Sequence, residues 1–280
     1  MKKYVVLVVV ALFSIGLTCL PTRANAEEAP DYKKLYSQGI EEGIINSETT
    51  LFEDWQRENE EEFYPNYKEA IATEDDLPEE FNNYETWLKV NNYGVPPEGD
   101  LGDWQDVTPG LRATWGGFTV KAGDIFMTNN TDSIGIVGHV AIANSDNYIL
   151  DMPGEKWNPQ NNNNRQLTVA SWLNTYKRSG KWVKVYRMNN QTIAKQVAKY
   201  ADRNYFSTTG SAVKNIKIPY KITADLFSKT PSYCSKLVYQ AYYYGSGSLP
   251  VLIKTYGIVT PYNIIGYFHL NYRPLLMKTF

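Results

Sequence analysis

The sequence predicts an α+β protein in which a small antiparallel sheet packs against helices. Short apolar runs bounded by turn residues occur between residues 125 and 188, as in a sheet of short strands. Apolar residues recur at helical spacing around 167–176, 192–205 and 233–244. A chain of 280 residues is long enough for one well-packed domain with an appendage.

The first 26 residues have the layout of a cleaved secretory signal. Two lysines precede an apolar run at 4–17, and the small-residue motif Ala24-Asn25-Ala26 follows it. The alternative is a membrane anchor, but the run is short for a bilayer span. The residues around Cys19 also make a poor lipidation site. We therefore expect a secreted protein whose mature chain begins near Glu27.

The charge divides the remaining chain into two parts. Residues 27–100 hold 21 acidic and 5 basic residues, a net charge of −16. Residues 101–280 hold 9 acidic and 20 basic residues, a net charge of +11. We therefore expect an acidic N-terminal segment at 27–105 and a basic domain at 106–280.

The acidic segment is expected to be helical and docked. Large apolar residues, among them Trp55, Phe63 and Trp87, are spaced as in short amphipathic helices, and Pro65 is expected to break the segment in its middle. Such side chains need burial, which a solvated spacer would not provide. We expect intramolecular docking of the acidic segment on the basic domain, as a lid or inhibitory cap held by charge.

The basic domain begins with the strand-like runs. Each follows a turn signal rich in glycine or asparagine, and together they predict a small antiparallel sheet over 125–128, 137–143, 148–151 and 182–188.

Cys234 is the candidate nucleophile. It is the only cysteine after the expected signal, in a protein bound for a compartment where cysteines usually pair. Ser232 is a plausible N-cap for the helix that follows, which places the sulfur in the first helical turn. The free amides and the helix dipole there favour a thiolate and can receive an oxyanion. A buried inert thiol is the alternative.

A thiolate hydrolase also needs a base, and His139 lies in a run of strand character. If this strand and 148–151 form a hairpin with a three-residue loop, Asp151 faces His139 and orients its imidazole. A four-residue loop would turn Asp151 to the other face. The sequence leaves both registers open, and the substitutes for the orienting role are Glu155, Asn144 and Asn147.

The other histidine, His269, lies among aromatic residues near the C-terminus and is interpreted as a packed or surface residue. Two histidines and one cysteine far apart in the chain lack the spacing of a zinc site. We therefore expect no metal, and hydrolysis through a thiolate and a histidine needs no organic cofactor.

Four motifs resemble one known family, the circularly permuted NlpC/P60 hydrolases of the YiiX/YycO type, which have a papain-like fold. They are Gly123-Asp124-Ile125-Phe126, Gly138-His139-Val140-Ala141-Ile142, Ile149-Leu150-Asp151 and Tyr233-Cys234-Ser235-Lys236-Leu237-Val238-Tyr239. In the permuted group the histidine strand precedes the cysteine helix, as in this chain. The resemblance covers roughly residues 112–268.

The resemblance implies Cys234 as nucleophile, His139 as base and a papain-like fold. Asp151 stands where relatives commonly have a glutamate, and Lys236 stands where they often have an acidic residue. Tyr233 is expected to line the substrate cleft, and packing at the helix start is the alternative.

The expected function is hydrolysis of amide bonds in cell-wall peptides by a secreted cysteine enzyme. Lipid acyl esters or thioesters are the second substrate class that the resemblance implies. A different class of function is a non-catalytic module whose basic surface holds an anionic envelope polymer, phospholipid or partner protein. Nucleic acid is not an expected partner, because the positive charge is dispersed and no nucleic-acid motif accompanies it.

Overall fold

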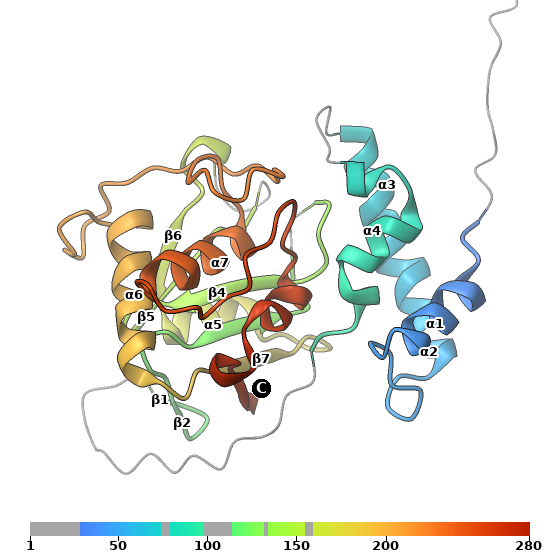
Figure 1. Cartoon of the computed structure of the whole chain (residues 1–280), viewed down its shortest axis with the longest axis horizontal. Helices are drawn as coiled ribbons and strands as arrows, with labels where there is room; N and C mark the ends of the chain where they lie inside the picture. The colour runs from blue at the N-terminus through green and yellow to red at the C-terminus, as the bar shows by residue number, and fades with distance from the viewer. Residues whose placement is uncertain (1–28, 74–78, 98–113, 132–133, 155–158) are drawn as a thin grey trace, which may run out of the picture. The chain divides into compact units, whose positions relative to one another are not determined.

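The computed structural model describes residues 29–73, 79–97, 114–131, 134–154 and 159–280, and within them it is a mixed α+β structure (Figure 1). Residues Asp31–Phe280 form one compact unit. The expected signal at 1–26 and the expected boundary at 105/106 lie outside the described residues. Across the described ranges, no helix is long and apolar enough to cross a membrane.

The described part of the acidic segment is helical. Its α-helices are α1 (Tyr32–Glu41), α2 (Phe52–Glu58), α3 (Tyr64–Thr73) and α4 (Tyr84–Val90), and short 3₁₀ turns lie at Glu79–Phe81 and Asn92–Gly94. The large apolar side chains point inward: Trp55 and Trp87 are buried, and the Trp55 indole donates to the carbonyl of Tyr93 at 2.8 Å. The segment therefore has an apolar core despite its charge.

Pro65 does not break this segment, so that expectation is wrong. Helix α2 continues through a π-helical turn, Asn59–Phe63, directly into α3. Proline has no N–H to donate, and its ring crowds the preceding turn. The wider π turn lies immediately before Pro65 and accommodates both effects, so the chain stays helical.

The second part of the chain is built on a six-stranded antiparallel sheet of order β6-β5-β4-β3-β7-β8. A separate two-stranded ribbon pairs β1 with β2. The strands are β1 (Thr114–Trp115), β2 (Phe118–Thr119), β3 (Ile125–Thr128), β4 (His139–Ala143), β5 (Tyr148–Asp151), β6 (Arg165–Thr168), β7 (Val183–Arg187) and β8 (Leu275–Thr279).

Helices cover both faces of the six-stranded sheet (Figure 1). Alternate residues of β4 contribute to two different cores: Val140 and Ile142 pack with α6 (Gln191–Tyr205) and α7 (Cys234–Gly245), whereas Ala141 packs with α5 (Val169–Tyr176). The remaining helical turns are 3₁₀ segments at Gln160–Asn162, Pro261–Tyr267 and Leu270–Tyr272. Because β4 is central and buried on both faces, it is a rigid base for any site at its ends.

The acidic segment contacts the chain just before β4. The Trp87 indole donates to the carbonyl of Gly135 at 2.8 Å, and the amide of Gly135 donates to Asn66 Oδ1 at 2.7 Å. The amide of Val137 donates to Asn91 Oδ1 at 2.8 Å. Three side chains of the segment thus hold the backbone that leads into β4.

Candidate active site

His139 is the first residue of β4, and its position depends on the glycine before it. Gly138 has a φ of +75°, and a Cβ there would lie 2.3 Å from Cε1 of Tyr262. Only glycine fits both constraints. The His139 ring stacks on Tyr176 of α5, with centroids 4.9 Å apart and planes 20° apart, and on Trp172 at 6.2 Å. The imidazole is therefore fixed by aromatic rings on one side.

The register of β4 and β5 brings Asp151 to His139. Ala143 pairs with Ile149, so residues 144–148 separate the last pair of β4 and β5, although Tyr148 already belongs to β5 through its pairing with β6. This connection between paired residues is longer than either loop length that the sequence suggested. Side chains alternate along each strand, so His139 and Asp151 both point to the face that Ala143 and Ile149 share. His139 Nε2 lies 3.1 Å from Asp151 Oδ2, and both side chains are buried.

Asp151 is the centre of a buried hydrogen-bond network. Arg165 donates to it with two nitrogens, Nε to Oδ1 at 3.0 Å and an η nitrogen to Oδ2 at 2.8 Å. The Trp172 indole and the Tyr176 hydroxyl also donate to Oδ2, at 3.0 and 3.1 Å. These donors hold the carboxylate in one orientation, and they stabilise its charge.

His139 and Asp151 shift each other's pKa in opposite directions. Burial works against a charged imidazole, but the hydrogen bond with Asp151 and the interactions with Cys234 outweigh it and raise the pKa of His139 to about 9. Burial also works against a charged carboxylate, but His139 and Arg165 hold the pKa of Asp151 well below its usual range. At neutral pH the pair is therefore an imidazolium beside a carboxylate.

Cys234 is the first residue of α7. The N-cap is Tyr233, not Ser232 as the sequence suggested, and no side chain caps the helix. The first backbone hydrogen bond of this helix is donated by the amide of Leu237 to the carbonyl of Tyr233, at 3.0 Å. The amides of the first turn, beginning at Cys234, consequently have no intrahelical acceptor, and they are hydrogen-bond donors in the same turn as the sulfur.

The imidazole of His139 interacts with Cys234 as well as with Asp151. His139 Nδ1 is buried and has no partner of full hydrogen-bond geometry among the described residues. Cys234 is close enough to contribute to the raised pKa of the imidazole. Cys234 and His139 are each 1% exposed, so a substrate reaches the sulfur only after neighbouring groups move apart.

Tyr233 and Lys236 hold the start of the cysteine helix. Tyr233 is fully buried, and its hydroxyl accepts the amide of Val259 at 3.2 Å. Its expected role in substrate binding stays a prediction. Lys236 Nζ donates to the carbonyl of Pro231 at 2.8 Å, and burial lowers the pKa of Lys236 to about 8. The lysine thus fastens the turn that precedes Cys234.

Sequence reasoning missed the residues that surround Asp151. The segment that begins at 167 was interpreted as helical, so β6 was not expected, although Asp151 and Arg165 face each other across β5 and β6. An arginine opposite an aspartate is a usable signal, but only once the two strands are known to pair. Trp172 and Tyr176 lie within the range of the family resemblance, but neither was given a role.

The remaining candidates lie elsewhere. His269 is exposed and precedes the 3₁₀ turn Leu270–Tyr272. Asn144 donates to Gln166 and Asp202, so it is engaged away from His139. Asn147 follows Asn144 in the loop after β4, and both residues line a surface pocket away from His139. Glu155 lies outside the described residues. Within the described ranges, no three histidine, cysteine or acidic side chains gather as a metal site would require.

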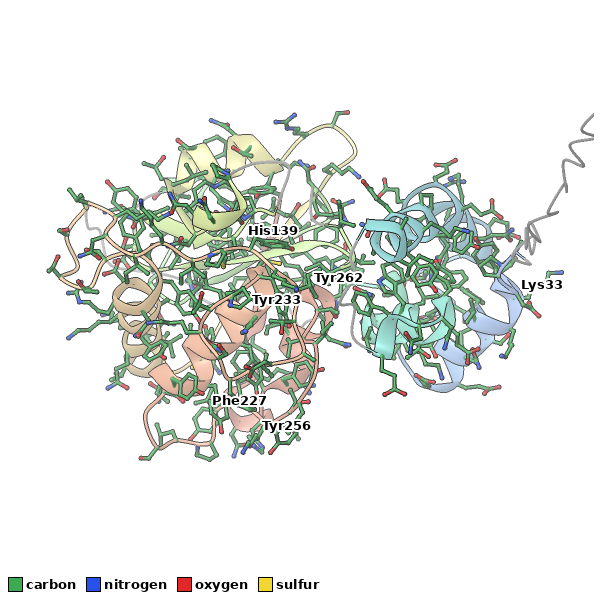
Figure 2. The ribbon with its side chains drawn as sticks, turned by 90° about the horizontal axis from the view of Figure 1, so that it is seen from above. Lys33, His139, Phe227, Tyr233, Tyr256 and Tyr262 are labelled. Atoms are coloured by element: carbon green, nitrogen blue, oxygen red, sulfur yellow. The ribbon has the colours of Figure 1, made fainter. Side chains whose placement is uncertain are left out.

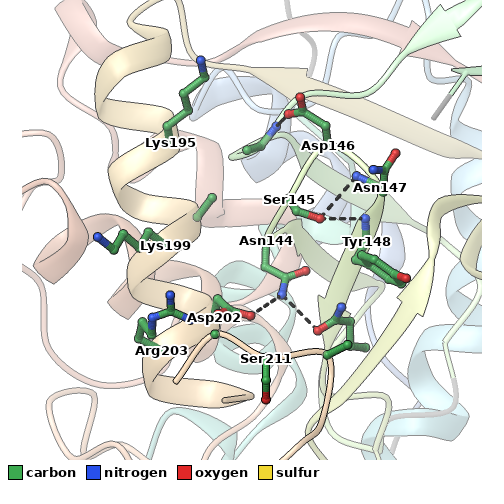
Figure 3. Close-up of a pocket in the computed structure, with 15 residues that line it drawn as sticks. Asn144, Ser145, Asp146, Asn147, Tyr148, Lys195, Lys199, Asp202, Arg203 and Ser211 are labelled. Carbon is green, nitrogen blue, oxygen red and sulfur yellow. Dashed lines mark hydrogen bonds and ion pairs between the residues drawn. The ribbon is translucent and has the colours of Figure 1, made fainter. Parts of the chain in front are cut away.

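A polar pocket of about 620 Å³ lies at the opposite end of β4 from His139 (Figure 3). Its lining includes the loop 144–148 and the α6 residues Lys195, Lys199 and Arg203. Because Cys234, His139 and Asp151 do not line it, this pocket is separate from the candidate active site.

The fold and this site define an α+β protein with a cysteine at a helix start beside a buried histidine–aspartate pair. Residues 112–280 match the family described as lipoprotein N-acylation protein, LnsA-like. The chain belongs to this family. It is also 50% identical, over the full length of both chains, to an uncharacterized 30.3 kDa protein of Bacillus thuringiensis. No solved structure matches the chain.

The match gives no support to the permuted NlpC/P60 assignment or to a cell-wall amidase, which were the first expectations. The second substrate class, lipid acyl groups, is closer to the family's description. The α+β class and the antiparallel sheet are observed.

Proposed function

We propose that the chain is a thiol-dependent acyl-transfer enzyme that takes an acyl group from a lipid ester. Cys234 is the nucleophile, His139 carries the proton and Asp151 orients His139. The observation that carries the proposal is the buried contact of His139 with Asp151, beside a cysteine at an uncapped helix start. The family's description, lipoprotein N-acylation, supplies the substrate class.

In the first half-reaction the sulfur attacks the ester carbonyl of the acyl donor. The attacking form is the thiolate, whose charge is balanced by the imidazolium of His139, and the free amides at the start of α7 receive the negative charge of the tetrahedral intermediate. The C–O bond then breaks, and the leaving alcohol takes a proton from His139. The products are an alcohol and a thioester on Cys234.

In the second half-reaction an amine attacks the thioester. His139, now neutral, accepts the proton that the amine loses, and an amide forms as the C–S bond breaks. The acceptor that the family's description indicates is the amino group of a lipoprotein. If water takes the place of the amine, the same site is a lipid acyl hydrolase.

The papain-like arrangement belongs to the same proposal. A histidine strand, β4, precedes a cysteine helix, α7, in the chain, and the two elements pack together within one core. This order is that of the permuted group that the motifs resemble. The family assignment changes the substrate from a wall peptide to a lipid acyl group and leaves the proposed thiol chemistry unchanged.

The first test is to trap the acyl-enzyme. The chain from Glu27 onward contains one cysteine, so any acylated thiol in it is Cys234. We expect incubation with a phospholipid in detergent to add the mass of one acyl group, and hydroxylamine at neutral pH to remove it, as it does for a thioester. Cys234→Ala should gain no mass. An equal gain of mass in Cys234→Ala would contradict the assignment of the nucleophile.

The second test distinguishes transfer from hydrolysis. A synthetic peptide that begins with an S-diacylglyceryl cysteine is added to the trapped acyl-enzyme, and its products are analysed by mass. We expect an acylated peptide amine from the wild type. Free fatty acid alone would identify a hydrolase, and the absence of both products would favour a non-catalytic binding module.

As a further proposal, the reaction takes place at the outer face of the cell membrane, after secretion of the chain.

A further inference from the structure

A cluster of aromatic side chains lies beside the second half of α7 and extends from the buried Tyr239 to the exposed Tyr256. Tyr239 and Tyr243 of α7 stack at 5.7 Å, and Phe227 packs edge to face on Tyr243 at 5.4 Å and on Tyr256 at 5.8 Å. Tyr267 packs edge to face on Tyr239 at 6.1 Å. Figure 2 shows Phe227 and Tyr256 side by side at the edge of the molecule, away from His139.

Exposed aliphatic side chains adjoin this cluster. The backbone of Ile253 pairs with Tyr267, and that of Val251 pairs with His269, so residues 249–253 lie beside 267–270. Ile253 is 46% exposed, Leu270 80% and Tyr256 72%. Single exposed apolar residues are common on soluble proteins, but a group of them around an aromatic cluster indicates a binding surface.

The same surface carries positive charge. Lys254 Nζ lies 5.3 Å from the ring centroids of both Phe227 and Tyr256. Lys229 is exposed in the same loop as Phe227. Over residues 206–280 there are eight lysines and arginines against one acidic residue, Asp225. A peptide or protein partner would be selected by an apolar groove, whereas tyrosines, exposed aliphatic side chains and lysines together are typical of the boundary between lipid headgroups and acyl chains.

We propose that this aromatic and basic surface, formed by 223–229, the second half of α7, 249–256 and 267–270, docks the protein on a bilayer of anionic phospholipid. Ile253, Tyr256 and Leu270 enter the interface, and Lys254 and Lys229 pair with lipid phosphates. Residues 27–100, with a net charge of −16, are repelled from such a membrane, so the basic part of the chain is the part that faces it.

The surface is built on the elements that carry the nucleophile. The Tyr239 hydroxyl donates to the carbonyl of Ile253 at 3.0 Å. The segment that follows reaches Val259, whose backbone binds both Tyr233 and Ser235 on either side of Cys234. Docking through this surface therefore engages a segment that also holds the residues on either side of Cys234, which suits the proposed acyl donor without depending on it.

The test measures binding to vesicles with a chain from Glu27 onward, because the apolar run at 4–17 would itself bind lipid. This chain retains the whole compact unit Asp31–Phe280. It also carries Cys234→Ala, so binding is measured without acyl transfer, and a failure to bind leaves the proposed function untouched. The probes are vesicles of equal parts phosphatidylglycerol and phosphatidylcholine, and vesicles of phosphatidylcholine alone. We expect co-sedimentation with the first, and binding at least about tenfold weaker to the second.

The matched control for Ile253→Glu is Ile71→Glu on α3. The two isoleucines have similar exposure, 46% for Ile253 and 40% for Ile71. We expect Ile253→Glu combined with Leu270→Glu to weaken binding at least about tenfold, and Ile71→Glu to leave it within twofold. Lys254→Glu should also weaken binding, and more so at low salt than at high salt. Equal losses in the Ile71 and Ile253 variants, equal binding to both vesicles, or no binding by the parent chain would each overturn the proposal. Circular dichroism confirms that the exposed substitutions leave the fold intact.

Discussion

The protonation of His139 depends on Asp151, and replacing that carboxylate tests the proposed mechanism directly. Asp151→Asn keeps the size of the side chain and removes its charge. The carboxylate is one of the groups that raise the pKa of His139 to about 9, against the effect of burial. An opposite charge in contact changes a pKa by about 1–3, so the pKa of His139 in the variant should fall by about that amount.

The magnitude can be stated as a free energy. A rise in pKa from 6.5 to about 9 corresponds to about 3 kcal/mol in favour of the charged imidazole in the folded state. Because the pKa is raised on folding, this stabilisation is fully present below about pH 6.5 and is lost as the pH rises through about 9. The free energy of unfolding of the wild type should therefore fall over that range by up to about 3 kcal/mol, and that of Asp151→Asn should fall less.

The assay is the rate of acyl-Cys234 formation in a single turnover, measured by intact-protein mass across pH. The alcohol leaves with a proton from His139, so the rate should drop above the pKa of His139. We expect this alkaline limit near pH 9 in the wild type, and about 1–3 pH units lower in Asp151→Asn. The same alkaline limit in Asp151→Asn as in the wild type would refute the reasoning.

Two further variants separate charge from structural damage. Arg165→Gln also disrupts the network, but it removes a positive charge, so the alkaline limit should not fall. Asp202→Asn removes a partly buried carboxylate that binds Asn144 and Arg203 away from the site, and its pH profile should match that of the wild type.

The remaining predictions concern the base, the turn before it and the acidic segment. His139→Ala should lower the acylation rate by at least about 10²-fold, whereas the exposed His269→Ala changes it little; the reverse order would remove His139 from the mechanism. Gly138→Ala should destabilise the fold by at least about 1–2 kcal/mol in urea unfolding, because of its positive φ and the contact with Tyr262. Deleting residues 27–97 should lower solubility and the unfolding midpoint, because the buried apolar side chains of this segment belong to the same hydrophobic core as Val140 and Ile142 of β4. A soluble truncation of unchanged stability would contradict that shared core.

Local patterns predicted most of the elements around the site. The strands expected at 125–128 and 148–151 have those bounds, and α6 and α7 begin within one residue of their expected starts. These segments combine a strong period with a clear turn or cap. The edge strands β6 and β8 were missed because β6 runs without interruption into α5, and β8 pairs with β7 across a long stretch of chain. Edge pairing of that kind is decided by tertiary contacts, which local periodicity does not contain.

The candidate site was predictable in its residues but not in its geometry. Cys234 and His139 could be chosen because the chain has few such side chains, and Asp151 because it lies near the end of the neighbouring strand. The distance of 3.1 Å between His139 and Asp151 depends on the length of loop 144–148, for which the sequence suggested only shorter alternatives. The register decided which face Asp151 occupies, and one residue more or less would have turned it away.

The contacts of the acidic segment also bear on how the site is held. A lid attached by charge should bind through ion pairs. Between the described residues of the acidic segment and those of the six-stranded sheet and its helices, the ion pair found joins Lys181 to Glu62 at 2.9 Å, and it is partly exposed. Exposed pairs of that kind contribute about 0–1 kcal/mol. The buried contacts are instead those of Trp87 and Asn91 with the backbone at 135–137. High salt should therefore leave the segment in place, because screening acts on charges and hardly on buried neutral hydrogen bonds. Since that backbone leads directly into His139, the acidic segment helps to position the proposed proton carrier. Loss of the segment should therefore lower the rate at which Cys234 is acylated, because the start of β4 would no longer be held.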